Sequence, residues 1–237
     1  MSETAGPKRF YKDVAVVEQD GRYAIALDGR IAKTYARRPL AAPNASLAEA
    51  VAVEWAAQGE RIERTTMPFT AMLSAAIDAN ESDVEAWREE IVKYVGSDLV
   101  CYRADEPQAL AERQAEIWDP YVDFMRRAFG AILITTAGIV AVPQAAASFS
   151  AVRAALEKET PETVFALQIA TAISGSAVLA LALWKGEAAP DALFEASRID
   201  ERFQEKRWGV DEEAKAREDR LRADFLKAAE FLSLLKG

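Results

Sequence analysis

Residues 14–34 read Val-Ala-Val-Val-Glu-Gln-Asp-Gly-Arg-Tyr-Ala-Ile-Ala-Leu-Asp-Gly-Arg-Ile-Ala-Lys-Thr. Apolar runs alternate in this stretch with Asp-Gly pairs at residues 20–21 and 28–29. β-branched and aromatic residues suit a pleated strand, and Asp-Gly supplies the positive φ angles of a tight hairpin turn. The spacing therefore predicts a three-stranded antiparallel meander that ends near residues 31–34.

The apolar period becomes helical after the prolines that follow this meander. Leu47, Val51 and Trp55 fall on one face of a helix. Ser46 and Glu49 have the spacing of a capping box, so we expect the helix to begin near Ser46. Trp55 lies on the apolar face and is interpreted as a structural anchor of the domain core or of a domain interface.

Residues Thr65–Pro68 indicate the end of one helix and the start of the next, because proline is suited to the first turn of a helix. We place a domain boundary there. We expect a β-rich domain over residues 1–64 and a helical domain over residues 65–237. The predicted fold class is α+β, with a small N-terminal antiparallel β domain followed by a larger, mainly α-helical domain.

Proline, glycine and capping signals divide residues 65–237 into helical segments. The expected segments are Ser82–Val95 with a capping box at Ser82 and Glu85, Pro107–Trp118, a helix that begins or kinks at Pro120, Pro161–Lys185, a helix that opens at Pro190, and Asp211–Leu235. The β-branched runs at residues 132–136 and 138–143 are expected to be short extended segments between helices.

The stretch Thr163–Trp184 carries no formal charge and is long enough to cross a bilayer. It consists mainly of alanine, contains several polar residues, and lacks a strong positive flank. We expect a buried central helix and no membrane insertion, with a membrane-attached factor as the alternative.

The chain is acidic, with a formal net charge of −9. Residues 1–64 hold 10 Lys and Arg against 9 Asp and Glu, so most of the negative excess belongs to residues 65–237. Nucleic-acid binding depends on Lys and Arg that neutralise phosphates, so we expect no nucleic-acid partner. A basic protein surface is a better match for the acidic part.

The sequence contains no histidine and one cysteine, Cys101. The commonest general base and the commonest nitrogen ligand for metals are therefore missing. There is no phosphate-binding glycine loop or dinucleotide motif. We expect no cofactor, no metal and no catalytic residue, and we interpret Cys101 as a small buried hydrophobic residue.

Carboxylates gather on both sides of Trp208-Gly209. They are Asp200, Glu201, Asp211, Glu212 and Glu213. Such acids usually lie on a solvated helix face, but paired carboxylates can also perform acid–base chemistry. A carboxylate-dependent hydrolase that uses the Glu201/Glu212 region is therefore the alternative to a binding protein.

Blocks spread over most of the chain resemble one known family. They are Arg9–Lys12 with Leu27–Thr34, Ala52–Gln58, Thr66–Thr70 with Ala76–Asp78, Asp98–Ala104, Gln114–Pro120, Asp200–Gln204 and Trp208–Ala214. Together they are similar to the assembly chaperones that escort the alpha subunit of the F-type ATP synthase head.

This resemblance implies a non-enzymatic protein that binds the unassembled alpha subunit before it pairs with beta. It implies action in the bacterial cytoplasm, or in the mitochondrial matrix if a presequence has been removed, and we expect a monomer. The acidic block is the expected partner-binding site, comprising Glu201, Phe203, Trp208, Asp211, Glu212 and Glu213.

Overall fold

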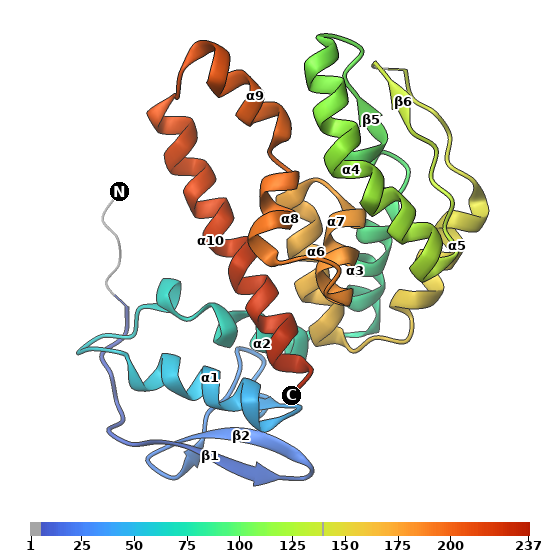
Figure 1. Cartoon of the computed structure of the whole chain (residues 1–237). Coiled ribbons are helices and arrows are strands. Elements are labelled where there is room, and N and C mark those ends of the chain that lie inside the picture. The colour runs from blue at the N-terminus through green and yellow to red at the C-terminus, as the bar shows by residue number, and fades with distance from the viewer. Residues whose placement is uncertain (1–5, 139) are drawn as a thin grey trace.

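The computed structural model describes residues 6–138 and 140–237, and it begins with the predicted antiparallel sheet (Figure 1). Strand β1 (Val14–Gln19) pairs with β2 (Arg22–Leu27), which pairs with β3 (Arg30–Ile31). Both Asp-Gly turns have positive φ at each residue, as a two-residue hairpin requires. The fold class and the meander are thus confirmed. A short strand that the sequence did not indicate, β4 (Ala41–Ala42), also pairs with β2.

Helix α1 (Ala45–Ala56) begins at a different cap from the one predicted. Its N-cap is Asn44, whose side chain accepts a hydrogen bond from the Leu47 amide. The same side chain donates to the carbonyl oxygens of Leu234 and Leu235 at the C-terminal end of the chain. The predicted capping box at Ser46 is therefore wrong, because Asn44, which also ties the end of the last helix to the start of α1, takes the capping position.

The helical part follows the predicted order, with several corrected bounds. Its elements are the 3₁₀ turn Arg64–Thr66, α2 (Pro68–Asp78), α3 (Glu81–Tyr94), the 3₁₀ turn Leu99–Cys101, α4 (Gln108–Phe129), α5 (Ala146–Leu156), α6 (Pro161–Ser174), α7 (Ala177–Lys185), α8 (Pro190–Ala196), α9 (Ile199–Trp208) and α10 (Glu212–Leu235). The capping box of α3 is formed by Asn80 and Asp83, two residues before the predicted pair. Helix α4 runs through Pro120 without ending.

The predicted single segment Pro161–Lys185 is two helices. Gly175 adopts the left-handed conformation and ends α6, and Ser176 caps α7. The fully buried carboxylate of Asp98 fixes this break, because it accepts hydrogen bonds from the Ser176 hydroxyl at 2.6 Å and from the Val178 amide at 3.0 Å. Within the described residues, no helix is both long enough and apolar enough to span a membrane.

Residues 131–138 and 140–145 are largely irregular, with one short strand, β6 (Thr136–Ala137), that pairs in parallel with β5 (Tyr102–Arg103). The predicted extended run thus forms strand only in part. Ile139, which belongs to that run, lies outside the described residues.

Polar contacts join the sheet to the helices. Arg22 in β2 forms an ion pair at 2.7 Å with Glu162 in α6. Glu54 in α1 accepts hydrogen bonds at 2.7 Å from the amides of Phe69 and Thr70, which are the free donors of the first turn of α2. The division into domains at residue 64 stays a prediction.

Candidate functional site

One structural feature projects from the helical body. Helix α9 and the first half of α10 form a hairpin that rises beyond α8 and α7 (Figure 1). We call residues 199–221 the arm. Gly209, with φ 87°, reverses the chain between the two helices, and Asp211 caps α10 by accepting from the amides of Glu213 and Ala214. In α9 only Ile199 is buried, and the exposed residues of this helix are Glu201, Gln204, Lys206, Arg207 and Trp208.

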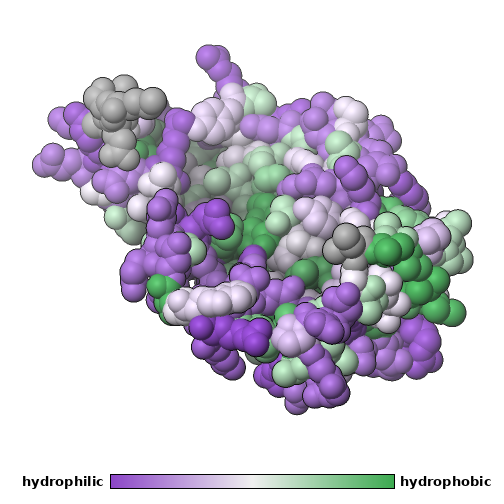
Figure 2. Space-filling view, turned by 90° about the horizontal axis from the view of Figure 1, so that it is seen from above, coloured by the Kyte–Doolittle hydropathy of each residue, from purple (hydrophilic) through white to green (hydrophobic). Residues whose placement is uncertain are grey.

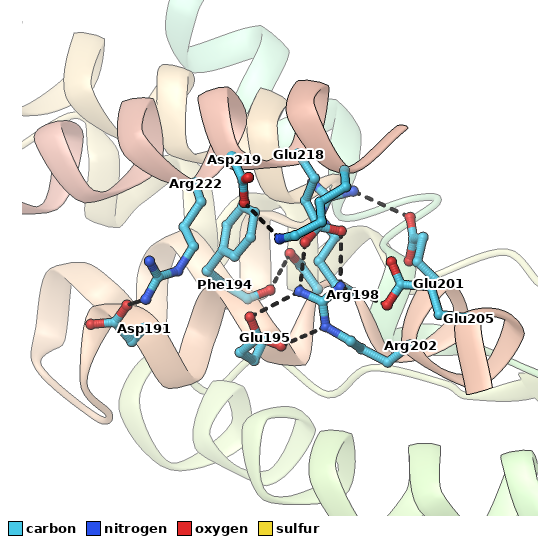
Figure 3. A network of polar contacts seen from close by, with 12 residues as sticks. Asp191, Phe194, Glu195, Arg198, Glu201, Arg202, Glu205, Glu218, Asp219 and Arg222 are labelled. Atoms are coloured by element: carbon cyan, nitrogen blue, oxygen red, sulfur yellow. Dashed lines mark hydrogen bonds and ion pairs between the residues drawn. The ribbon is translucent and has the colours of Figure 1, made fainter. Parts of the chain in front are cut away.

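Arg202 holds the arm together (Figure 3). Its guanidinium bonds both carboxylate oxygens of Glu195 in α8, at 2.9 and 3.1 Å. It also pairs with Glu205 in α9 at 3.1 Å and with Glu218 in α10 at 2.5 Å. Hydrogen bonds from Arg202 lower the pKa of Glu195, and these carboxylates raise the pKa of Arg202. One arginine therefore joins α8, α9 and α10 at the arm.

The predicted partner-binding residues all lie on the arm. They differ in what their side chains do. Glu201 is about half exposed and pairs with Arg198 at 3.3 Å, whereas Phe203 is half-buried beneath the guanidinium of Arg207. Trp208 is 76% exposed and forms the apolar tip.

The three acids beyond the tip divide by role. Asp211 is occupied as the helix cap. The side chains of Glu212 and Glu213 are exposed and make no ion pair within the described parts of the chain. The structure thus brings the six predicted residues to one feature, and their role in binding stays a prediction.

Two adjoining pockets lie beside the arm. The first, of about 300 Å³, is lined by Leu99 and Trp118 of the body and by Glu201 of α9. The second, of about 290 Å³, lies between α9 and α10 and reaches Trp208. Seen from above, the molecule is hollowed, with hydrophobic side chains in the depression and hydrophilic ones around it (Figure 2).

Arg198 lines both pockets. It donates to the carbonyl oxygen of Ile173, while its buried Nε has no hydrogen-bond partner in the described structure. A buried donor without a partner is unfavourable unless something else satisfies it.

Sequence reasoning missed Gln114, which anchors the base of α9. Its side-chain amide donates to Asp200 at 2.6 Å and accepts from the Ala104 amide at 2.7 Å. The backbone carbonyl oxygen of Gln114 accepts a hydrogen bond from Arg103, whose guanidinium also pairs with Asp119 at 2.8 Å. No local pattern indicates this role, since Gln114 and Asp200 are far apart in the sequence.

Trp55, the predicted anchor, lies in the N-terminal part and away from the arm. Its side chain is partly buried against the core, and its carbonyl oxygen accepts from the Tyr11 hydroxyl at 2.8 Å. The indole Nε1 is buried and makes no hydrogen bond to the described residues. The anchoring role stays a prediction.

The ionisable groups with raised pKa values serve structure. Burial raises the pKa of Asp98 to about 6 and also raises that of Glu54, yet both carboxylates are occupied as helix caps. Burial raises the pKa of the Cys101 thiol to about 12, which leaves it an unreactive core residue. In the described ranges, no cluster of three or more His, Cys, Asp and Glu side chains is placed to hold a metal ion.

Comparisons with known proteins agree with this architecture. A family model described as ATP12 chaperone protein matches residues 8–126. The mitochondrial protein atp12 of Schizosaccharomyces pombe is 24% identical over 219 residues, which cover 87% of this chain and 75% of that protein.

Solved structures give the same result. The crystal structure of Atp12 from Paracoccus denitrificans has a TM-score of 0.92 and 36% identity, covering 96% of this chain and 98% of the other. The structure of Atu1473 from Agrobacterium tumefaciens has a TM-score of 0.89 and 39% identity, covering 97% of this chain and 85% of the other.

Proposed function

Because the chain belongs to the ATP12 chaperone family, a family of non-enzymatic assembly factors for ATP synthase, we propose that it binds the unassembled alpha subunit of the synthase head. It prevents aggregation of that subunit until the beta subunit replaces the chaperone on its surface. The hydrolase alternative is wrong, because the family consists of chaperones.

The observation that carries this proposal is the exposed arm. Alpha and beta subunits alternate in the head, so an unpaired alpha subunit displays an apolar surface that is prone to aggregate. A covering protein needs apolar area within a polar rim. Trp208 is 76% exposed and Val210 is 53% exposed at the tip of the arm, and acids lie on both sides of them.

The acids give this surface its specificity. Glu201, Glu212 and Glu213 are exposed on a protein of net charge −9, so they attract basic groups of the partner. Charge pairs at an interface contribute more to partner choice and association rate than to raw affinity. Phe203 and Trp208 then supply the apolar contact. This division of roles allows selective capture of moderate affinity and later release to beta.

The proposal includes a compartment and an oligomeric state. The chaperone acts as a monomer, in the bacterial cytoplasm or in the mitochondrial matrix. Support for the compartment comes from the relatives, of which one is named as mitochondrial and others come from Paracoccus denitrificans and Agrobacterium tumefaciens.

A refolding assay tests the proposal. Purified alpha subunit is diluted from urea, and light scattering is followed with equimolar chaperone present. We expect wild type to suppress scattering, and Glu201→Lys and Trp208→Ala to lose most of the suppression while keeping their melting temperatures. Glu157→Lys, an exposed charge reversal at the end of α5, is the matched control and is expected to act as wild type.

Unchanged suppression by both arm variants would remove the assignment of the site to the arm. No suppression by wild type would remove the proposed function itself.

A further inference from the structure

A separate pocket is lined by residues of the N-terminal part. The strands β1 and β2 of this part lie at the opposite end of the molecule from the arm (Figure 1). The pocket measures about 430 Å³. Its aromatic walls are Phe10, Tyr11 and Trp55, and Leu27 and Ile31 add aliphatic surface. We call it the N-terminal pocket. Nothing in the proposed function uses it.

Tyr11 lies at the centre of the aromatic wall and is fixed by several contacts. Tyr11 is buried, packs edge-on against Phe10 at 5.3 Å and against Trp55 at 5.6 Å, and donates its hydroxyl hydrogen to the Trp55 carbonyl. The guanidinium of Arg9 lies over the Tyr11 ring and bonds the carbonyl oxygen of Gln58. Phe10 nevertheless leaves 71% of its surface exposed. Aromatic side chains such as Phe10 are enriched at protein interfaces.

The rim of the N-terminal pocket carries positive charge. Arg30 and Lys33 line it, both are exposed, and neither side chain makes a hydrogen bond or ion pair with any residue that the structure describes. The lining carboxylate, Asp28, is already engaged by the amides of Lys12 at 3.0 Å and Asp13 at 2.8 Å. The pocket therefore offers two unpaired cations on a protein whose overall charge is negative.

We propose that the N-terminal pocket binds an extended segment of a partner protein in which an apolar side chain is flanked by Asp or Glu. The apolar side chain fills the space between Phe10, Trp55 and Ile31, and the flanking carboxylates pair with Arg30 and Lys33. Arginine presents a planar fork that suits a carboxylate. The segment is opposite in charge to the one that the acidic arm attracts, and this inference stands whether or not the arm binds alpha.

Fluorescence anisotropy with defined peptides tests the inference on the full chain. The probe is fluorescein-labelled Gly-Asp-Phe-Asp-Glu-Gly, and the control peptides replace its Phe by Gly or its acids by Lys. We expect saturable binding of the probe alone, weaker in high salt because the charges are exposed. Arg30→Glu/Lys33→Glu is expected to weaken binding about tenfold, and Phe10→Ala about fivefold.

A second double charge reversal, placed outside the pocket, gives the protein the same net charge as Arg30→Glu/Lys33→Glu and leaves the pocket intact. Lys93→Glu/Lys158→Glu changes two exposed lysines of the helical part and is expected to bind the probe as wild type does. Glu201→Lys is also expected to bind it normally, which separates this site from the arm. Thermal melting of every variant checks that the fold is kept, and Phe10 is exposed enough for its removal to leave the core unchanged.

Three results would overturn the inference. The first is equal binding of the peptide that lacks Phe, which would indicate simple charge attraction. The second is equal weakening by Lys93→Glu/Lys158→Glu. The third is concentration-dependent self-association of the chain that Arg30→Glu/Lys33→Glu abolishes, which would make the occupant a second copy.

Discussion

Replacing Arg202 with methionine should loosen the arm without disturbing the core. Methionine keeps most of the aliphatic stem and removes the guanidinium that joins Glu195, Glu205 and Glu218. The Arg202 side chain is 33% exposed and that of Glu218 only 14%, so the Arg202–Glu218 pair is shielded from water more than an ordinary surface pair. The variant leaves three carboxylates facing one another with no cation between them.

The size of the effect follows from these contacts. Exposed ion pairs contribute about 0.2–1 kcal/mol each, and bidentate, part-buried ones lie at the upper end. Three such pairs around one side chain are not additive, so we expect Arg202→Met to lower the free energy of unfolding by about 2 kcal/mol. Arg202→Met/Glu218→Gln should recover part of this loss, because one of the repelling charges is gone.

Urea unfolding followed by tryptophan fluorescence measures this change, with Arg220→Met as the control on an exposed arginine of the arm.

The stability lost in Arg202→Met depends on pH in a defined direction. Arg202 lowers the pKa of Glu195 in the folded protein, so its contribution is complete above the ordinary glutamate pKa of 4.5 and is lost as the pH falls through the lowered folded value. The difference in free energy of unfolding between wild type and Arg202→Met should therefore be largest at pH 7 and should become smaller as the pH falls through the lowered pKa of Glu195.

A loss within about 0.5 kcal/mol of the Arg220→Met control would refute this reasoning, since that is the range of neutral surface changes. If the difference in free energy of unfolding became larger in acid, the charge argument would be refuted, even if Arg202→Met lost much stability at pH 7.

Three further predictions concern the buried polar groups. Glu54→Gln should lower the free energy of unfolding in urea by about 2 kcal/mol, because an amide nitrogen replaces one of the acceptors that cap α2, and an equal loss in the exposed control Glu49→Gln would contradict this. Burial raises the pKa of Asp98 to about 6, so the folded state holds this proton more tightly than the unfolded chain does. The stability of wild type relative to Asp98→Asn should then rise by about 1 kcal/mol between pH 7 and pH 5, and a fall would contradict it. Cys101 should react with a thiol reagent in urea and hardly at all in the native protein, whereas equal rates would show that it is accessible.

The sheet could be predicted because its signals are local. Each Asp-Gly pair sets its own turn, and the runs between them have no other strong preference. The corrected helix bounds depend on distant residues. Asn44, and not Ser46, caps α1, because the Asn44 amide group also donates hydrogen bonds to the end of α10. Gly175-Ser176 carried the signal for a helix break, but the apolar run obscured it, and the buried partner Asp98 comes from another part of the chain.

Helix α4 shows a limit of proline as a stop signal. Pro120 removes one backbone hydrogen bond, to the carbonyl of Glu116, and both residues are exposed, so water can satisfy that carbonyl. Trp118 and Phe124 are buried on either side and keep the helix continuous.

The candidate site was predicted in composition but not in organisation. Its acids and Trp208 are visible in the sequence, and the resemblance singled them out. The role of Arg202 as the centre of the arm was not visible, because Glu195 and Glu218 reach it from separate helices. The N-terminal pocket was missed for the same reason, since Arg30 and Trp55 meet only in the folded chain.

We propose that this protein shields the alpha subunit of the synthase head. The most direct measurement is co-expression of the tagged chain with the alpha subunit and, in parallel, with the beta subunit, followed by fractionation and affinity capture. We predict that alpha stays in the supernatant and co-purifies with the chain, whereas beta does not. Capture of beta in preference to alpha, or of neither, would contradict the claim.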